Sequence, residues 1–168
     1  MTRIPARIEW AVRLLDIEAD DQIVEIGGGN GAAAQLVLHA LGPDGGLVFI
    51  DRSPIAIARA TARNGDDPRF VAVEGDFADS QLQAGSIDKI FAINVNVFWT
   101  GDAVAELKAI REALGPEGEL LLVYDAPNPE RLDEVGDRVT TSLTRAGLTM
   151  DLQVKEDGLV LAVVTGRL

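Results

Sequence analysis

The sequence predicts an α/β fold: a doubly wound, mostly parallel seven-stranded sheet with helices on both faces and a C-terminal antiparallel hairpin. Three observations support this prediction. Short apolar segments alternate with amphipathic ones along the chain, which is typical of strands followed by helices. A glycine-rich turn, GGGNG, joins the first apolar segment to the helix after it. The last two apolar segments are separated by Glu156-Asp157-Gly158, and an Asp-Gly pair favours a hairpin turn.

Apolar spacing and capping residues predict the helices. In the opening segment apolar residues recur at a helical spacing, and two further residues widen the stripe: Ile4, Ile8, Val12 and Leu15, with Trp10 and Ala11. The later helices are expected at Ala32–Leu41, from Ser53-Pro54 onward, at Ala103–Leu114, and from Asn128-Pro129 to Gly147. Serine or asparagine followed by proline is a typical helix start, because the side chain caps the first turn and proline suits the first helical position.

The strands are predicted from short apolar runs between these helices. They are expected at Gln22–Ile26, Leu47–Ile50, Phe70–Val73, Ile87–Ile93, Glu119–Tyr124, Leu148–Val154 and Leu159–Val164. The run at 119–124 is rich in Leu and Val, as expected for a parallel strand covered on both faces. With no linker and no internal repeat, the whole chain, 1–168, is expected to form one domain.

Composition excludes several classes of function. The chain has 168 residues, no cysteine and a single histidine, so thiolate metal sites, cysteine nucleophiles and multi-histidine sites are excluded and no metal is expected. Its 15 Lys and Arg against 27 Asp and Glu give a net charge of −12, which argues against a nucleic-acid partner. The N-terminal segment lacks the apolar core of a signal peptide, and no apolar run is long enough for a membrane span. A cytoplasmic protein is therefore expected.

The residues just past the strands are the most informative, because ligands of open parallel sheets bind outside the carboxyl ends of the strands. The GGGNG loop lets the backbone approach a ligand closely. Asp51 ends the second strand, where a carboxylate can accept both hydroxyls of a ribose. Asp76 follows the third strand and is suited to accept from an adenine amine, with Phe77 or Ala78 beside the ring.

Two cofactors are compatible with these residues alone. Gly27, Gly29 and Ala32 satisfy G-x-G-x-x-A, a dinucleotide fingerprint, which leaves NAD open. Glu25, however, extends the loop to E-x-G-x-G-x-G. The segments VEIGGGNG, FIDRSP and VEGDF, with DKIFAINVNVFW and ELKAIREALGPEGELLLV after them, resemble class I S-adenosylmethionine-dependent methyltransferases. The resemblance extends from about Trp10 to Val164.

At the matching positions the resemblance implies a cofactor site. Its members are Glu25, Gly27, Gly28, Gly29, Gly31, Asp51, Arg52, Gly75, Asp76, Phe77 and Asn94. The resemblance implies that the Glu25 carboxylate supports the amino end of the cofactor, and that the glycines pass under the methionyl and ribose parts of the cofactor. It places the ribose hydroxyls at Asp51, the adenine between Arg52 and the Asp76-Phe77 pair, and the methyl group near Asn94. S-adenosylhomocysteine is the expected product.

The acceptor is less constrained. Asn94 is followed by Val95-Asn96-Val97 rather than the Pro-Pro-Tyr or Pro-Pro-Phe typical of amino-group methylation of DNA bases or glutamine. The pocket for the acceptor is expected to form from an N-terminal helix within residues 1–20 that packs over the cofactor side, and from the loops at 94–102 and 124–128. A small-molecule acceptor is expected.

The catalytic residues are not determined. The candidates are Asn94, Tyr124 and Asp125. Trp10, Phe98 and Trp99 are interpreted mainly as core aromatics, His39 as a surface or packing residue, and Arg3 and Arg7 as a solvated face or a site for a carboxylate.

Three functions stay open from the sequence. The first is an S-adenosylmethionine-dependent methyltransferase that transfers the methyl group in line to a small molecule. The second is a catalytically weak or inactive cofactor-binding partner subunit, and a homodimer would also be compatible with a shallow pocket. The third, a short NAD(P)-dependent oxidoreductase, is disfavoured because no Tyr-x-x-x-Lys motif or catalytic histidine is present.

Overall fold

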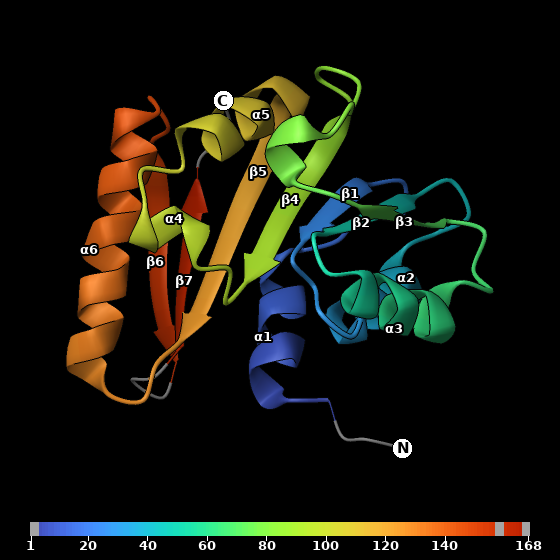
Figure 1. Ribbon diagram of the computed structural model, residues 1–168, viewed down its shortest axis with the longest axis horizontal. Coiled ribbons are helices and arrows are strands. Elements are labelled where there is room, and N and C mark those ends of the chain that lie inside the picture. The colour runs from blue at the N-terminus through green and yellow to red at the C-terminus, as the bar shows by residue number, and fades with distance from the viewer. Residues whose placement is uncertain (1–3, 157–159, 166–168) are drawn as a thin grey trace.

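A computed structural model describes residues 4–156 and 160–165, with the side chains of residues 4–150. One sheet runs through the molecule in the order β3-β2-β1-β4-β5-β7-β6 (Figure 1). In chain order its strands are β1 (Gln22–Ile26), β2 (Gly46–Asp51), β3 (Phe70–Glu74), β4 (Ile87–Ile93), β5 (Leu114–Asp125), β6 (Met150–Glu156) and β7 (Val160–Thr165). The first five in chain order pair in parallel, and β7 is antiparallel to both β5 and β6.

This topology agrees with the predicted α/β fold and doubly wound parallel sheet. Strand order reverses between β1 and β4, because β1 pairs with β2 on one side and with β4 on the other. The carboxyl ends of β1 and β4 therefore form the switch point of the sheet. The antiparallel pairing of β6 with β7 was also predicted. The turn between them was predicted at Glu156-Asp157-Gly158, but residues 157–159 lie outside the described part of the chain.

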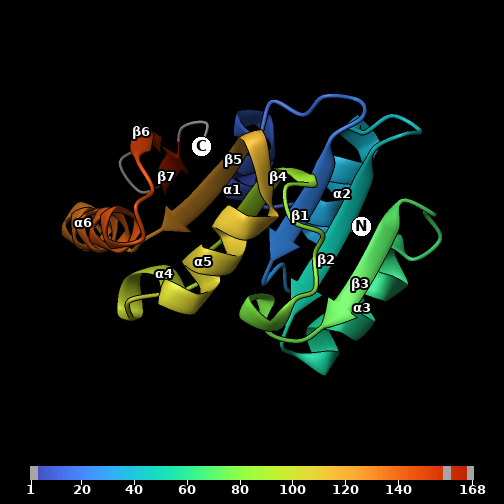
Figure 2. The ribbon, with the colours of Figure 1, turned by 90° about the horizontal axis from the view of Figure 1, so that it is seen from above.

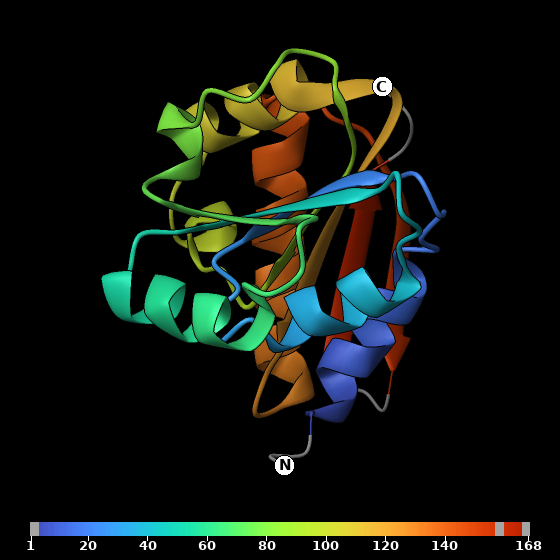
Figure 3. The same ribbon diagram turned by 90° about the vertical axis from the view of Figure 1, so that its right-hand side faces the viewer.

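Helices cover both faces of the sheet (Figures 2 and 3). The helices are α1 (Ala6–Leu14), α2 (Ala32–Ala40), α3 (Pro54–Asn64), the 3₁₀ turn η1 (Phe77–Asp79), α4 (Val97–Thr100), α5 (Val104–Ala113) and α6 (Pro129–Arg145). Ser53 and Asn128 cap α3 and α6 through their side chains, as their sequence positions predicted. The described residues contain no helix that is long and apolar enough to cross a membrane.

Two apolar clusters, one on each face, form the core. Trp10, Val37 and Phe49 belong to the cluster under α1 and α2. Leu107 and Leu132 belong to the cluster under α5 and α6. The central strands β1, β4 and β5 are largely buried on both sides, which explains why their sequences read as continuous apolar runs, whereas β3 at the edge exposes Val71 and Val73.

The N-terminal helix is rotated relative to the predicted stripe. Trp10, Ala11 and Leu15 are buried, whereas Ile8 and Val12 are only partly buried. The small Ala11 side chain is fully buried beside α2, so a position that was predicted only to widen the stripe lies at its centre.

The 94–102 segment also differs from its prediction as a loop, because residues 97–100 form the short helix α4. Backbone bonds from Trp99 and Thr100 to the Asn96 carbonyl, and the Thr100 hydroxyl bonded to the same carbonyl, stabilise this single turn. The strand predicted at 119–124 begins earlier, because Leu114 pairs with Ile87 across an irregularity in the ladder.

Gly31 caps α2 at a crowded contact with α3. Its backbone has a φ of +71°, and a Cβ atom there would lie 2.9 Å from Ala60 Cα and 2.7 Å from Asn64 Nδ2. The buried Asn64 side chain donates to the Gly31 carbonyl at 3.0 Å. Gly29 has a similar φ of +61°, but a Cβ atom at this position would have no neighbour within 4 Å.

Substitutions at the two glycines therefore distinguish the cost of backbone strain, which both share, from the cost of overpacking, which arises only at Gly31. Gly29→Ala should lower the free energy of unfolding by about 1–2 kcal/mol, the usual cost of a left-handed conformation. Gly31→Ala should cost about 1–3 kcal/mol more, because the methyl group overpacks α3 against α2. Urea denaturation of both variants measures the difference. Equal losses of unfolding free energy in the two variants would contradict this prediction, because they would show that α2 and α3 can separate at little cost.

Candidate functional site

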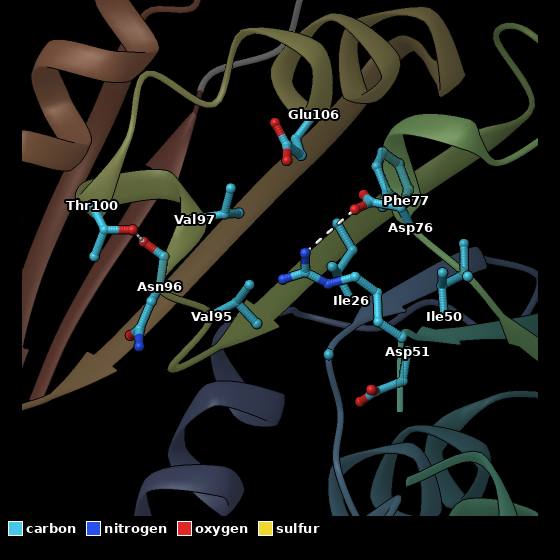
Figure 4. A pocket seen from close by; sticks show the side chains of 13 residues that line it. Ile26, Ile50, Asp51, Asp76, Phe77, Val95, Asn96, Val97, Thr100 and Glu106 are labelled. Carbon is cyan, nitrogen blue, oxygen red and sulfur yellow. Dashed lines mark hydrogen bonds and ion pairs between the residues drawn. The ribbon is translucent and has the colours of Figure 1, made fainter. Parts of the chain in front are cut away.

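Two cavities lie at the carboxyl ends of the strands, on either side of the glycine loop. The larger, of about 460 Å³, is lined by Ile26, Gly27, Ile50, Asp51, Arg52, Gly75, Asp76, Phe77, Val95, Asn96, Val97, Thr100 and Glu106 (Figure 4). The smaller, of about 270 Å³, is lined by Pro5, Arg7, Ile8, Glu25, Gly27, Gly28, Gly29, Asn30, Ala32, Ala33, Ile93 and Asn94. The structure thus brings together every residue of the predicted cofactor site except Gly31, which lines neither cavity.

Asp51 connects the end of β2 to the glycine loop. Its Oδ2 accepts from the Gly29 backbone N–H at 3.2 Å, and its Oδ1 accepts from the Ser53 N–H at 2.9 Å. Because the Ser53 side chain itself caps α3, Asp51 is not needed as a cap. A carboxylate has about four acceptor positions, so these two bonds leave capacity for ligand hydroxyls.

Arg52 and Asp76 both line the larger cavity and form an ion pair with each other. Arg52 Nη1 lies 3.5 Å from Asp76 Oδ2, and Asp76 Oδ1 accepts from the Ala78 N–H at 3.2 Å. The arginine side chain is 72% exposed, so this ion pair is weak and can open without a large cost. Phe77 is buried and contributes an apolar wall.

Glu25 lies buried beneath the glycine loop. A Cβ atom at Gly28 would overlap Glu25 Oε1 and the Phe49 ring, so only glycine permits this close approach. The pKa of Glu25 is raised to about 8, mainly by burial; a hydrogen bond from the Ala34 backbone N–H lowers it in part, and the nearby charge of Asp51 contributes to the increase. Glu25 Oε2 is buried and has no hydrogen-bond partner among the described residues.

Asn94, Asp125 and Arg7 form a polar network over the ends of β4 and β5. Asn94 Nδ2 donates to Asp125 Oδ1 at 2.6 Å, and the Asp125 backbone N–H donates to Asn94 Oδ1 at 3.0 Å. Asn94 has a φ of +58°, a conformation that asparagine tolerates better than most residues. Arg7 Nη1 on α1 lies 3.2 Å from Asp125 Oδ2. Arg7 Nε is buried and, within the described part of the chain, has no hydrogen-bond partner.

Of the predicted catalytic candidates, Tyr124 differs in environment from the other two. Its hydroxyl donates to the Val95 carbonyl at 3.0 Å, and burial raises the pKa of the phenol above its ordinary value. The Tyr124 hydroxyl is therefore used in a structural hydrogen bond beneath the site. Asn94 and Asp125 are exposed at the sheet edge.

Sequence reasoning missed part of the larger cavity. Val97, Thr100 and Glu106 line it from α4 and the first turn of α5. The missed signal is the helical turn formed by VFWT directly after Asn96, a segment that was interpreted as a loop. Glu106 lies in the first turn of α5, where an acidic residue is commonly found because it interacts favourably with the helix dipole. Its sequence position therefore gave no sign that it lines a cavity.

The aromatic residues near the site are packing residues, as interpreted from the sequence. Trp10 and Phe98 are buried. Trp99 Nε1 bonds Asn96 Oδ1 at 3.3 Å, and the Arg131 guanidinium lies 4.7 Å from the centroid of its ring. His39 is exposed on α2, and Arg3 lies outside the described residues.

Comparison with known proteins identifies the family. A family model described as "Methyltransferase domain" matches residues 24–120, which is more than half of the chain. The chain belongs to the class I S-adenosylmethionine-dependent methyltransferase family. The match covers β1 to β4 and the start of β5, and it therefore includes the glycine loop, Asp51 and Asp76.

Individual relatives of this methyltransferase are distant. It is 33% identical over 123 residues, 73% of its length, to a protein of Hamiltonella defensa named "Ribosomal RNA small subunit methyltransferase H". The matched segment spans only 37% of that protein, and 28% of the protein of the same name from Nitrosomonas europaea.

Solved structures share its fold. A "SAM dependent methyltransferase" from Aquifex aeolicus has a TM-score of 0.82 at 16% identity, covering 96% of this chain and 89% of the other. A complex between the Trm112 methyltransferase activator of Haloferax volcanii and "the putative methyltransferase" has a TM-score of 0.76 at 18% identity, covering 95% and 87%.

The methyl donor of the family is S-adenosylmethionine, and the residues at this site fit it. The larger cavity offers a carboxylate at Asp51 and an apolar wall at Phe77, as a nucleoside requires. Arg7 and Glu25 line the smaller cavity, and each has one buried polar atom, Nε and Oε2, without a hydrogen-bond partner among the described residues. No metal-binding group of His, Cys, Asp or Glu occurs among the residues described.

Buried Glu25 should make stability depend on pH. Between about pH 4.5 and pH 8 the folded protein keeps a proton on Glu25 that the unfolded chain releases. The free energy of unfolding contributed by this group therefore falls as pH rises through that window, by up to about 1.4 kcal/mol per pH unit.

Glu25→Gln removes this titration. Relative to the wild type, the variant should gain stability steadily from pH 5 to pH 8, as measured by urea denaturation at each pH. Glu9→Gln, at an exposed position of α1, is the matched control and should follow the wild-type profile. Parallel profiles for Glu25→Gln and wild type would contradict the raised pKa.

Proposed function

We propose that this chain is an S-adenosylmethionine-dependent methyltransferase whose acceptor is a small molecule. The observation that carries the choice of acceptor is the charge at the site. Both arginines at the two cavities are paired with carboxylates, Arg52 with Asp76 and Arg7 with Asp125. Asp51 and Glu106 add further acidic groups, so the described residues at this edge offer no surplus positive charge for a phosphate backbone.

The proposed division of the donor site follows the two cavities. Asp51 would accept the ribose hydroxyls, and Asp76 with Phe77 would bind the adenine edge once Arg52 moves aside over the ring. The glycine loop between the cavities would pass under the ribose and methionyl parts. When bound, S-adenosylmethionine supplies a methyl group activated by a sulfonium.

The residues at the ends of β4 and β5 would align the acceptor. The reciprocal bonds between Asn94 and Asp125 fix both side chains at the edge of the smaller cavity. Aligning nucleophile and methyl group can supply about 7–11 kcal/mol of the barrier. Asp125 is the exposed carboxylate of this pair, so it would orient a hydroxyl or amine of the acceptor and accept its proton.

Ribosomal RNA is the acceptor named for the distant curated relatives, and it is less compatible with this chain. Those proteins are much longer than the segment they share with it. The net charge of −12 repels a polyanion. A cofactor-binding subunit that works through a partner stays an alternative, because one structural relative was solved with an activator.

The donor site is tested by calorimetric titration with S-adenosylhomocysteine, which needs no knowledge of the acceptor. Wild type should bind it, and Asp51→Asn should bind about 10–100-fold more weakly, because hydrogen bonds to a charged group contribute about 1.5–3 kcal/mol. Asp79→Asn, an exposed carboxylate of η1 outside both cavities, serves as the control and should bind like wild type.

NAD⁺ is titrated beside it and should give no binding signal. Folded protein that binds no S-adenosylhomocysteine would refute the proposed function. Binding together with methyl transfer to pooled small metabolites, and not to ribosomal RNA at any salt concentration, would support the proposed acceptor class. Transfer to RNA that weakens steeply with salt would overturn it.

A further inference from the structure

One edge of the sheet combines an unpaired strand with most of the exposed apolar side chains. β3 pairs only with β2 and forms the end of the sheet opposite β6 (Figure 2). Four large hydrophobic side chains are exposed among the described residues. Val71 and Val73 lie on β3, Ile55 lies on α3, which packs against β3, and only Val104 lies elsewhere. Monomeric proteins rarely expose contiguous apolar surface, so this edge is a candidate for contact with a partner.

The connection from β3 to β4 leaves one face of β3 uncovered. Val71 and Val73 lie beside Val48 and Ile50 of β2, on the face of the sheet that carries the cluster under α5 and α6. Between β3 and β4 the only helical segment is the short 3₁₀ turn η1. Phe77 of this turn packs in the same cluster as Ile50, but the two valines on the outermost strand remain 52% and 39% exposed.

β3 also lacks most of the features that protect edge strands from pairing. Such strands usually carry charged side chains, prolines or bulges. In β3 the residues from Phe70 to Val73 carry no charge, and the ladder with β2 has no bulge. The strand has one charged residue, Glu74, at its end. The edge is therefore open to a further strand.

The backbone of β3 points alternately toward β2 and away from it. The Arg69 carbonyl accepts from the Leu47 N–H, and the Gly75 N–H donates to the Asp51 carbonyl, so the odd-numbered residues of this segment bond to β2. The N–H and carbonyl of Ala72, at the centre of the strand, therefore point away from the sheet. They are oriented to bond a strand added at this edge.

We propose that a second copy of this chain adds its own β3 to this edge, antiparallel and in register about Ala72, so that the two sheets join into one. In this register Ala72 exchanges its backbone hydrogen bonds with Ala72 of the second copy. Val71 lies opposite Val73 of the second copy, and Val73 lies opposite its Val71. The strand is thus complementary to itself, as an interface with two-fold symmetry requires. The valines of the two copies cover one another on the face that η1 leaves open.

The distribution of charge favours a second copy as the partner. Residues 52–76, which form α3, β3 and the turns next to them, contain four arginines and four acidic residues and are neutral in sum. The rest of the chain therefore carries the whole net charge of −12, and two copies repel each other least at this edge. A strongly charged partner finds no surplus counter-charge here, whereas a second copy presents a neutral, apolar strand of the same pattern.

Sedimentation velocity over a series of concentrations measures this association. Because β3 has only five residues, the contact is small and the dimer should dissociate on dilution. Wild type should pass from the 17.9 kDa monomer to twice this mass as the concentration rises. Val71→Lys should raise the dissociation constant of the dimer about 10–100-fold, because a two-fold interface loses the valine contact twice.

Val104→Lys is the matched control for Val71→Lys. Val104 is similarly exposed but lies on α5, so this variant should associate like wild type. Both substitutions move the net charge toward zero by the same amount, so weaker association of Val71→Lys cannot come from long-range repulsion. A monomer at all concentrations up to about 1 mM would overturn the proposal and leave the edge to a different protein. A dimer that Val71→Lys does not weaken more than the control would overturn it by placing the contact elsewhere.

Disulfide formation tests the register, because the chain has no cysteine of its own. In the proposed register, residues 71 and 73 of opposite copies form a non-hydrogen-bonded pair with Cα atoms about 4.5 Å apart, within the span of a disulfide. Val71→Cys mixed with Val73→Cys should therefore form a disulfide-linked dimer under mild oxidation. Val71→Cys alone should form much less, since its two copies of residue 71 lie about 7–8 Å apart on the diagonal.

Val71→Cys mixed with Val104→Cys controls for random collision and should give no more linked dimer than Val71→Cys alone. A mixture of Val71→Cys and Val73→Cys that forms no linked dimer would contradict the register, as would equal linkage in Val71→Cys alone. Neither measurement contains a methyl donor, so the outcome is independent of the proposed function.

Discussion

The packing of a glycine loop directly onto a buried carboxylate is the constraint on which the site depends. Glu25 occupies the space that any side chain at Gly28 would need, and Phe49 closes the same space from β2. The loop therefore lies flat over the switch point of the sheet, and one cavity opens on each side of it. A larger residue at position 28 would have to displace the Glu25 carboxylate or the Phe49 ring.

Short polar links then fix the loop to the neighbouring strand ends. Asp51 holds the Gly29 N–H from β2, and Asn94 and Asp125 tie the end of β4 to the end of β5. Each link joins residues that are at least 22 positions apart in sequence. They meet because parallel strands place all their carboxyl ends at one edge, so the sheet topology alone provides most of the geometry of the site.

This dependence on topology explains what could be predicted from the sequence. The strand ends, the glycine loop and the capping residues are local signals, and Asp51, Asp76 and Glu25 were placed correctly at one edge. Local patterns could not show that Arg7 meets Asp125, because the two are separated by most of the chain. They also could not show that the Tyr124 hydroxyl is used by the Val95 carbonyl, since this depends on how closely β5 packs on the segment after β4.

The distribution of charge has a further consequence for the acceptor. The long-range field of a chain with a net charge of −12 is screened over about 8–10 Å at physiological salt, so it influences encounter more than binding. Selection at the site itself depends on the contacts that replace the Arg7–Asp125 pair. An acceptor that brings a hydrogen-bond donor or a positive charge would replace Arg7 at Asp125 and form a charge-assisted bond with this carboxylate.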